Sequence, residues 1–208
     1  GGGNDTVIGA GSADVLTLLT AGTIAVSNLG TVIATTGVGD IVNMLGAGTI
    51  GVSRVETVLG TTSTSTDDVV RMLGAGTVSV SRIETVLGSG GSDIAKLLGT
   101  NANVAVSEVE TIIAGSGTTD RVRMLSGGTI SLSGVETVTG TAGSTDVARL
   151  MAATTLAVSA IETVIGTAAG TDGVRLLGNG TVAISEIERV YGTTATGEVV
   201  QLVGAETL

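Results

Sequence analysis

Residues 146–166 read DVARLMAATTLAVSAIETVIG, and this stretch decides the fold. An acid opens it, and apolar residues follow at alternate positions. A Thr-Leu-Ala-Val-Ser segment at 155–159 repeats the alternation, and an Ile-Glu-Thr-Val segment at 161–164 places its apolar residues three apart. Period-two alternation is typical of β-strands, and β-branched residues disfavour helix. The stretch therefore predicts three short strands, with a bend at Glu-Thr in the third.

The same pattern recurs along the whole chain. The Glu of the third segment recurs with spacings of 28, 26, 26, 26 and 26 residues, at Glu56, Glu84, Glu110, Glu136, Glu162 and Glu188. The opening acid occurs at eight positions: Asp14, Asp40, Asp68, Asp93, Asp120, Asp146, Asp172 and Glu198. Units of about 26 residues fill the 208-residue chain and leave no room for a second domain. A fixed period of this length indicates a repeat architecture.

Segments of five or six residues cannot bury an apolar face alone, so neighbouring units must stack. We predict an all-β chain that forms one parallel β-solenoid domain over residues 1–208, of the β-helix or β-roll kind. It should have about eight coils of ~26 residues, with three short strands per coil. Gly-rich corners such as 46–48 separate the segments. Val80, Val106 and Val158 should point inward, and Ser107 outward.

The composition excludes several kinds of site. The chain has no Cys, His, Pro, Phe or Trp, and Tyr191 is its one aromatic residue. Disulfides, Cys- or His-ligated metals and Ser-His or Cys-His catalysis are therefore excluded. With 9 Lys plus Arg against 19 Asp plus Glu, the net charge is −10. We expect no enzyme and no nucleic-acid partner, and no apolar run is long enough for a membrane span.

Stacked coils would place equivalent residues of successive units in columns. Two columns would hold acids, and a third would hold five bases: Arg71, Lys96, Arg123, Arg149 and Arg175. Like charges ~4.8 Å apart repel by about 1 kcal/mol per pair even in water, so an acidic column needs relief. Six or more equivalent copies and no cleft argue against a catalytic carboxylate pair, so two interpretations stay open. Either Asp caps the turn through the backbone while Glu pairs with Arg, or the acids bind divalent cations.

The second segment should present a flat outward face of small residues. Thr23, Ala25 and Ser27 lie on it, and so do the equivalent residues of later units. Such an array could order water, as in ice-binding solenoids, or pack against another domain or protomer. Only one Thr per unit lies on this face, where two would be the persuasive pattern.

Residues 1–17 differ from the later units. They read GGGNDTVIGAGSADVLT, with acids nine residues apart at Asp5 and Asp14. This start resembles the hemolysin-type (repeats-in-toxin) nonapeptide, Gly-Gly-x-Gly-x-Asp-x-hydrophobic-x, whose Gly turns and Asp carboxylates bind Ca²⁺ between β-roll coils. The resemblance covers under a tenth of the chain, and the second copy departs from the pattern at Ala10 and Ser12. It implies Ca²⁺ at Asp5 and Asp14 in the N-terminal coil and no required cofactor elsewhere.

The later units carry Val-Ser-x-Val-Glu-Thr-Val-x-Gly or a close variant. They resemble the longer repeats found beside such nonapeptides in bacterial surface-layer proteins and giant type I-secreted adhesins, in a calcium-independent form. This resemblance covers nearly all of the chain and implies an extracellular, cell-surface location.

We therefore expect a non-enzymatic structural segment of a secreted bacterial cell-surface protein, in a surface layer, adhesin stalk or filament. Neither end of the sequence carries a charged run or a helical segment that would cover the last coil. Its partners would then be other copies of itself or adjacent repeats of a longer chain. The alternative is a ligand-binding solenoid that uses its Thr/Ser or acidic columns for ice or Ca²⁺.

Overall fold

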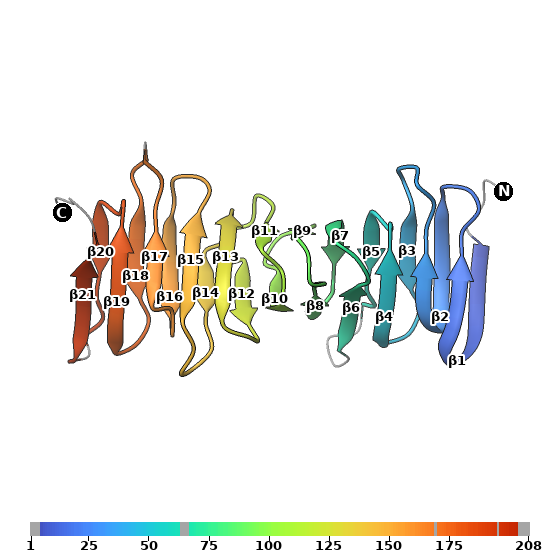
Figure 1. The fold of residues 1–208 in the computed structure, drawn as a ribbon, viewed down its shortest axis with the longest axis horizontal. Coiled ribbons are helices and arrows are strands. Elements are labelled where there is room, and N and C mark those ends of the chain that lie inside the picture. The colour runs from blue at the N-terminus through green and yellow to red at the C-terminus, as the bar shows by residue number, and fades with distance from the viewer. Residues whose placement is uncertain (1–4, 63–66, 169, 195, 204–208) are drawn as a thin grey trace. The chain divides into compact units, whose positions relative to one another are not determined.

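The chain folds as a parallel β-solenoid of about 11 turns (Figure 1). The computed structural model describes residues 5–62, 67–168, 170–194 and 196–203, and there is no helix among them. Residues 1–4, the start of the nonapeptide-like segment, lie outside the described part. The chain divides into two compact units, Gly1–Leu98 with Ser107–Val109 and Gly99–Val106 with Glu110–Leu208. We refer to them as unit 1 and unit 2.

Short strands and tight corners alternate in both units. The strands of unit 1 are β1 (Asp5–Thr17), β2 (Thr23–Ile33), β3 (Ile41–Met44), β4 (Gly48–Ser53), β5 (Thr57–Leu59), β6 (Asp68–Met72), β7 (Gly76–Ser81), β8 (Thr85–Leu87) and β9 (Asp93–Leu97). β10 (Asn103–Ser107) has its residues 103–106 in unit 2. The remaining strands of unit 2 are β11 (Thr111–Ile113), β12 (Arg121–Met124), β13 (Gly128–Ser133), β14 (Thr137–Thr139), β15 (Asp146–Leu150), β16 (Thr155–Ser159), β17 (Thr163–Ile165), β18 (Gly173–Leu176), β19 (Gly180–Ser185), β20 (Arg189–Tyr191) and β21 (Glu198–Leu202).

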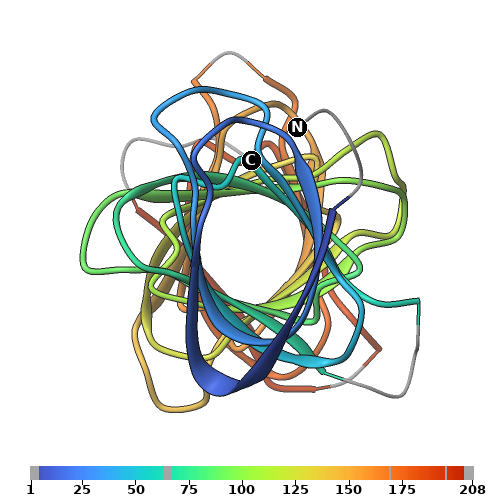
Figure 2. The same cartoon turned by 90° about the vertical axis from the view of Figure 1, so that its right-hand side faces the viewer.

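Within each unit, a strand from β3 onward pairs in parallel with the second strand after it, whereas the longer β1 pairs with β2, and β2 pairs with both β3 and β4. In unit 2, Ala148 of β15 lies opposite Val164 of β17, and Leu156 of β16 lies opposite Val174 of β18. These partners are 16 and 18 residues apart, and the third kind of pair, β14 with β16, has partners 20 apart. One turn therefore takes about 18 residues and contains two strands. Figure 2 shows the winding of the strands from one end.

This winding corrects the predicted eight coils of ~26 residues with three strands each. From β3 onward each sequence repeat has the three predicted strands, but each strand with its corner takes about nine residues and makes half a turn. A repeat of three strands is thus one and a half turns, so equivalent strands of successive repeats lie on opposite sides of the solenoid. The error came from equating the repeat of the sequence with the turn of the backbone.

The predicted columns of identical residues are wrong for the same reason. Along one sheet the strand types follow in the order first, third and second segment, as in β15, β17 and β19. Arg149 therefore lies between Ser131 and Ile165, and not beside another base. Among the described strands, equivalent Thr or Ser residues of successive repeats are therefore not direct neighbours, as the row of Thr57, Ser79 and Lys96 in unit 1 shows. Ice binding stays a prediction.

The inward positions agree with the prediction. Val80, Val106 and Val158 are exposed by only 2%, 3% and 3%, and Ser107 is half-exposed. The interior consists of Val, Ile, Leu, Met and Ala side chains, because adjacent turns ~4.8 Å apart must interlock without voids. Thr23, Ala25 and Ser27 alternate with buried Ile24 and Val26, so they do point outward.

The third segment bends where its apolar spacing predicts. Val55 and Val58 are three apart and both buried, and β5 begins only at Thr57. The residue two before the Glu has positive φ, as at Arg54 (57°) and Ala160 (51°), and redirects the chain into the last strand. A non-Gly residue in this left-handed region costs about 1 kcal/mol, so the rest of the repeat must hold the bend in place.

We expect Val80→Asp to abolish folding or to lower the free energy of unfolding by more than about 4 kcal/mol, because it places an unpaired charge in the apolar interior. The matched change Ser79→Asp puts the same group on the outward side, opposite Lys96 in the register. It should alter the free energy of unfolding by no more than about 0.5 kcal/mol. Urea unfolding followed by circular dichroism measures both, and equal losses would contradict the inward assignment.

Candidate functional site

The opening acid of the repeat is a buried residue. Six aspartates in this position are 0–1% exposed: Asp40, Asp68, Asp93, Asp120, Asp146 and Asp172. A carboxylate is rarely buried this completely unless hydrogen bonds replace its water. The polar partners of these carboxylates therefore decide what the recurring acid does.

Asp146 shows the arrangement. Its Oδ1 accepts a hydrogen bond from the Gly128 N–H at 3.0 Å, in the corner 18 residues earlier. Its Oδ2 accepts from the Thr141 N–H at 2.5 Å and from the Thr141 hydroxyl at 2.8 Å, in the corner just before β15. Its own N–H donates to Oε2 of Glu162 at 2.7 Å, 16 residues later. One aspartate thus joins the backbone of three consecutive turns.

The same bracket recurs with small changes. Asp172 uses Thr154, Thr167 and Glu188, and the eight hydrogen-bond distances of the Asp146 and Asp172 brackets lie between 2.5 and 3.0 Å. Asp40 uses Gly22, Thr35 and Glu56. In Asp93 the hydroxyl comes from Ser89. In most repeats a Thr or Ser follows the small residue that ends the third segment, as Thr141 follows Gly140. The sequence prediction did not include this hydroxyl residue.

The Glu of the third segment belongs to this bracket. Its Oε2 accepts a hydrogen bond from the N–H of the buried Asp one turn earlier, at a distance of 2.6–2.8 Å. This contact is made by Glu56, Glu84, Glu136, Glu162 and Glu188. Its N–H in turn donates to the carbonyl oxygen of the same Asp, as from Glu162 to Asp146 at 3.1 Å. This Glu therefore makes a backbone contact that the sequence does not predict, while the turn-capping role of Asp is confirmed.

Two buried carboxylate oxygens lack a donor among the described residues, Oδ1 of Asp68 and Oδ2 of Asp120. In the Asp120 repeat, Gly115 stands where Thr141 stands in the Asp146 repeat. The side-chain hydroxyl that would reach Oδ2 is therefore missing. The change to Gly115 thus removes one of the two donors that Oδ2 has at Asp146.

The predicted calcium residues lie in the first strand. Asp5 is exposed at the start of β1, and Oδ2 of Asp14 accepts hydrogen bonds from the Ala10 and Gly11 N–H groups at 2.5 and 3.1 Å. Across the described part of the chain, no group of three or more Asp, Glu, His or Cys side chains is placed to hold a metal ion. Calcium at Asp5 and Asp14 stays a prediction that the resemblance supplies.

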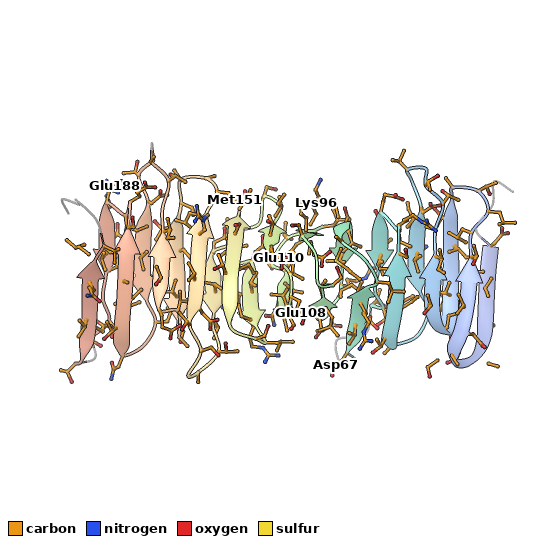
Figure 3. All side chains as sticks on the ribbon, viewed as in Figure 1. Asp67, Lys96, Glu108, Glu110, Met151 and Glu188 are labelled. Atoms are coloured by element: carbon orange, nitrogen blue, oxygen red, sulfur yellow. The ribbon has the colours of Figure 1, made fainter. Side chains whose placement is uncertain are left out.

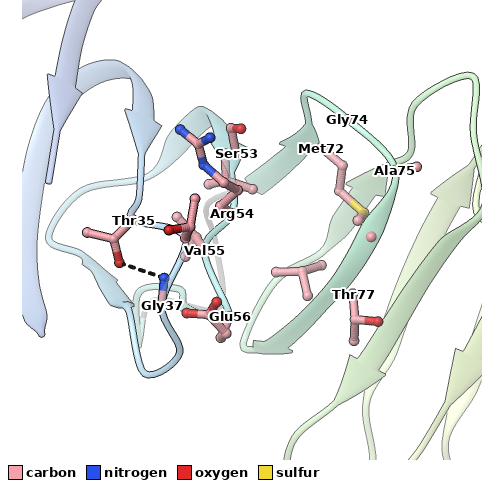
Figure 4. Close-up of a pocket in the computed structure, with 14 residues that line it drawn as sticks. Thr35, Gly37, Ser53, Arg54, Val55, Glu56, Met72, Gly74, Ala75 and Thr77 are labelled. Atoms are coloured by element: carbon pink, nitrogen blue, oxygen red, sulfur yellow. Dashed lines mark hydrogen bonds between the residues drawn. The ribbon is translucent and has the colours of Figure 1, made fainter. Parts of the chain in front are cut away.

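The surface recesses follow the repeat. One of about 360 Å³ lies in unit 1 between residues 52–56 and 72–78 and includes Thr35 and Glu56, two partners of Asp40 (Figure 4). Equivalent residues line two smaller recesses. One of about 160 Å³ lies between residues 26–29 and 46–50, and one of about 150 Å³ lies between residues 158–162 and 178–182. A recess that recurs with the corner geometry is a product of the repeat and does not mark one catalytic centre.

Comparison with known proteins found no matching family model, no matching curated protein and no matching solved structure. A search of the described residues for a helix long and apolar enough to cross a membrane also found none. The site is therefore defined by its own geometry, which is a set of buried Asp–Glu brackets that join successive turns.

We expect Asp146→Ala to lower the free energy of unfolding by about 3 kcal/mol or more, because the Gly128 and Thr141 donors would lose their acceptor in a buried place. Asp67→Ala is the control, since Asp67 is an exposed acid outside the bracket and the charge change is the same. It should cost no more than about 0.5 kcal/mol. Denaturant unfolding of both variants decides, and similar small losses would show that the brackets do not stabilise the fold.

Calcium removal gives a second test. If Ca²⁺ binds only at Asp5 and Asp14, a chelator should lower stability by at most about 3 kcal/mol and leave the β-sheet signal in circular dichroism intact. Asp14→Asn should abolish the response to calcium. Complete unfolding on chelation would mean that the buried aspartates bind Ca²⁺ throughout, against the bracket geometry.

Proposed function

We propose that the chain is a non-enzymatic structural repeat segment of a secreted bacterial cell-surface protein, in a surface layer, adhesin stalk or filament. The observation that carries the proposal is the use of the recurring acids. The six buried Asp side chains accept hydrogen bonds from backbone N–H groups, and five of the Glu side chains accept the N–H of an Asp one turn earlier. The residues best suited to catalysis or metal binding therefore serve the stacking of the solenoid. The repeat resemblance supports the surface location.

Self-association, or continuation into adjacent repeats, is part of this proposal. Inward residues of the middle turns are almost fully buried, for example Ile184 at 0% exposed. Leu202, its register partner in the last described strand, is 42% exposed, and Val7 and Leu16 in β1 are half-exposed. Apolar surface and unpaired strand edges of this kind favour contact with a further turn, from another copy or from a longer chain.

Antibodies raised against the purified chain test the location. They should label intact cells that produce the protein, and mild proteolysis of intact cells should remove the label. Label that appears only after the cells are permeabilised would contradict the proposal.

Sedimentation of the purified chain tests the self-association. Assemblies larger than 20.1 kDa should grow with salt, because salt screens the net charge of −10. A monomer at every salt concentration would leave only continuation within a longer chain.

A further inference from the structure

One sheet of unit 2 gathers arginines that are scattered in the sequence. Strands β12, β14, β16, β18 and β20 pair in this order in parallel register. Their outward side chains include four exposed arginines and the single aromatic residue of the chain, at Arg121, Arg123, Arg175, Arg189 and Tyr191. We call these five residues the basic face. The odd-numbered strands from β11 to β21 form the other side of unit 2, and Arg149 is the only base among their residues.

The register fixes how the basic face is arranged. Arg121 and Arg123 are two residues apart on β12, which places their Cα atoms about 6.6 Å from each other on the same side. Arg175 lies directly opposite Tyr191, and Arg189 lies opposite Gly173 on the neighbouring strand. β12 and β18 are three strand spacings apart, or about 14 Å. The basic face thus has two arginine pairs separated by β14 and β16.

The fold does not require these residues. At the position of Arg189 the other repeats carry Thr, as at Thr137 and Thr163, and at the position of Arg121 they carry an aliphatic residue or Gly, as at Val147. The position of Tyr191 is held by Ile165 in the preceding repeat. Three departures from the repeat pattern therefore fall on one face of one unit, where stacking alone would accept the usual residue.

The net charge of the chain, −10, gives no indication of this basic face. Six of the acids are buried aspartates, which present no carboxylate to a partner. Of the acids that border the basic face, Glu136 and Glu188 each direct Oε2 to an aspartate N–H, and Glu186 is exposed in the corner before β20. Figure 3 shows Glu188 at the corner next to β20. Unit 2 therefore presents a basic face although the chain as a whole has a net charge of −10.

We propose that the basic face binds a linear anionic polysaccharide. Guanidinium groups bind carboxylate or sulfate groups through paired hydrogen bonds, and the two arginine pairs would engage charges at separate points of an extended chain. Between them lie Thr137, Thr139, Thr155 and Ser159, whose hydroxyls can exchange hydrogen bonds with sugar hydroxyls.

Other partners fit the face less well. It has no large aliphatic side chain at its centre, where a protein interface has its apolar core. It offers one ring, Tyr191, where binding of single-stranded nucleic acid relies on several stacked aromatics. A single tyrosine beside Arg175 suits stacking on one sugar ring. The proposal does not depend on the cell-surface location.

The test measures the affinity of the 208-residue chain for heparin and for polygalacturonate by isothermal titration calorimetry at low salt, with dextran as the neutral polymer. The double variant R121V/R189T restores the residues usual at these positions, so it should fold normally. It should bind at least one of the two anionic polymers about tenfold more weakly, or worse, with a shallower salt dependence. Tyr191→Ile should weaken binding without changing the salt dependence.

The control R71T/R149T removes the same charge outside the basic face and should leave the affinity unchanged. Equal losses in the two double variants would reduce the effect to nonspecific charge and overturn the proposal. Absence of binding to both anionic polymers would overturn it as well. Tighter binding to single-stranded DNA than to either polysaccharide, lost in R121V/R189T, would assign the face to nucleic acid instead.

Discussion

The structure depends on a buried carboxylate that holds backbone groups of neighbouring turns. A parallel solenoid satisfies most peptide groups through its strands, but its corners leave N–H groups without partners in the sheet. Asp146 accepts the Gly128 and Thr141 N–H groups in two such corners, and Glu162 closes the bracket from the next turn. Once these donors surround the Asp, its removal is costly because the donors would remain buried without an acceptor.

This bracket also explains the unusual composition. The acids number 19, but a third of them lie inside the solenoid, so the surface is less acidic than the net charge of −10 suggests. The interior accepts Val, Ile, Leu and Met because each turn must pack on the next at strand spacing, where a large ring would leave voids in neighbouring turns. The hydrogen bonds at the corners and the apolar packing of the interior are thus parts of one repeated arrangement.

Much of this fold could be predicted from sequence. Alternation identified the strands and the inward side of Val80 and Val158, and the three-residue spacing of Val55 and Val58 located the bend. The turn length could not be read from the repeat, because three strands per repeat are compatible with either one turn or one and a half. The nine-residue spacing of Asp5 and Asp14 was the available signal, since nine residues is one half-turn. The partners of the buried Asp and the basic face depend on that winding, so they were not predictable until the register was known.

Cysteine cross-linking tests the winding most directly, because the chain has no native Cys. Ser131 and Arg149 are outward register partners 18 residues apart, whereas Ser131 and Ala157 are equivalent residues of successive repeats, 26 apart. A disulfide needs Cα atoms about 4.4–6.8 Å apart, which neighbouring parallel strands provide. The pair Ser131→Cys with Arg149→Cys should form an intramolecular disulfide on mild oxidation, and Ser131→Cys with Ala157→Cys should not. Efficient cross-linking of the second pair and failure of the first would show 26-residue coils and contradict the account.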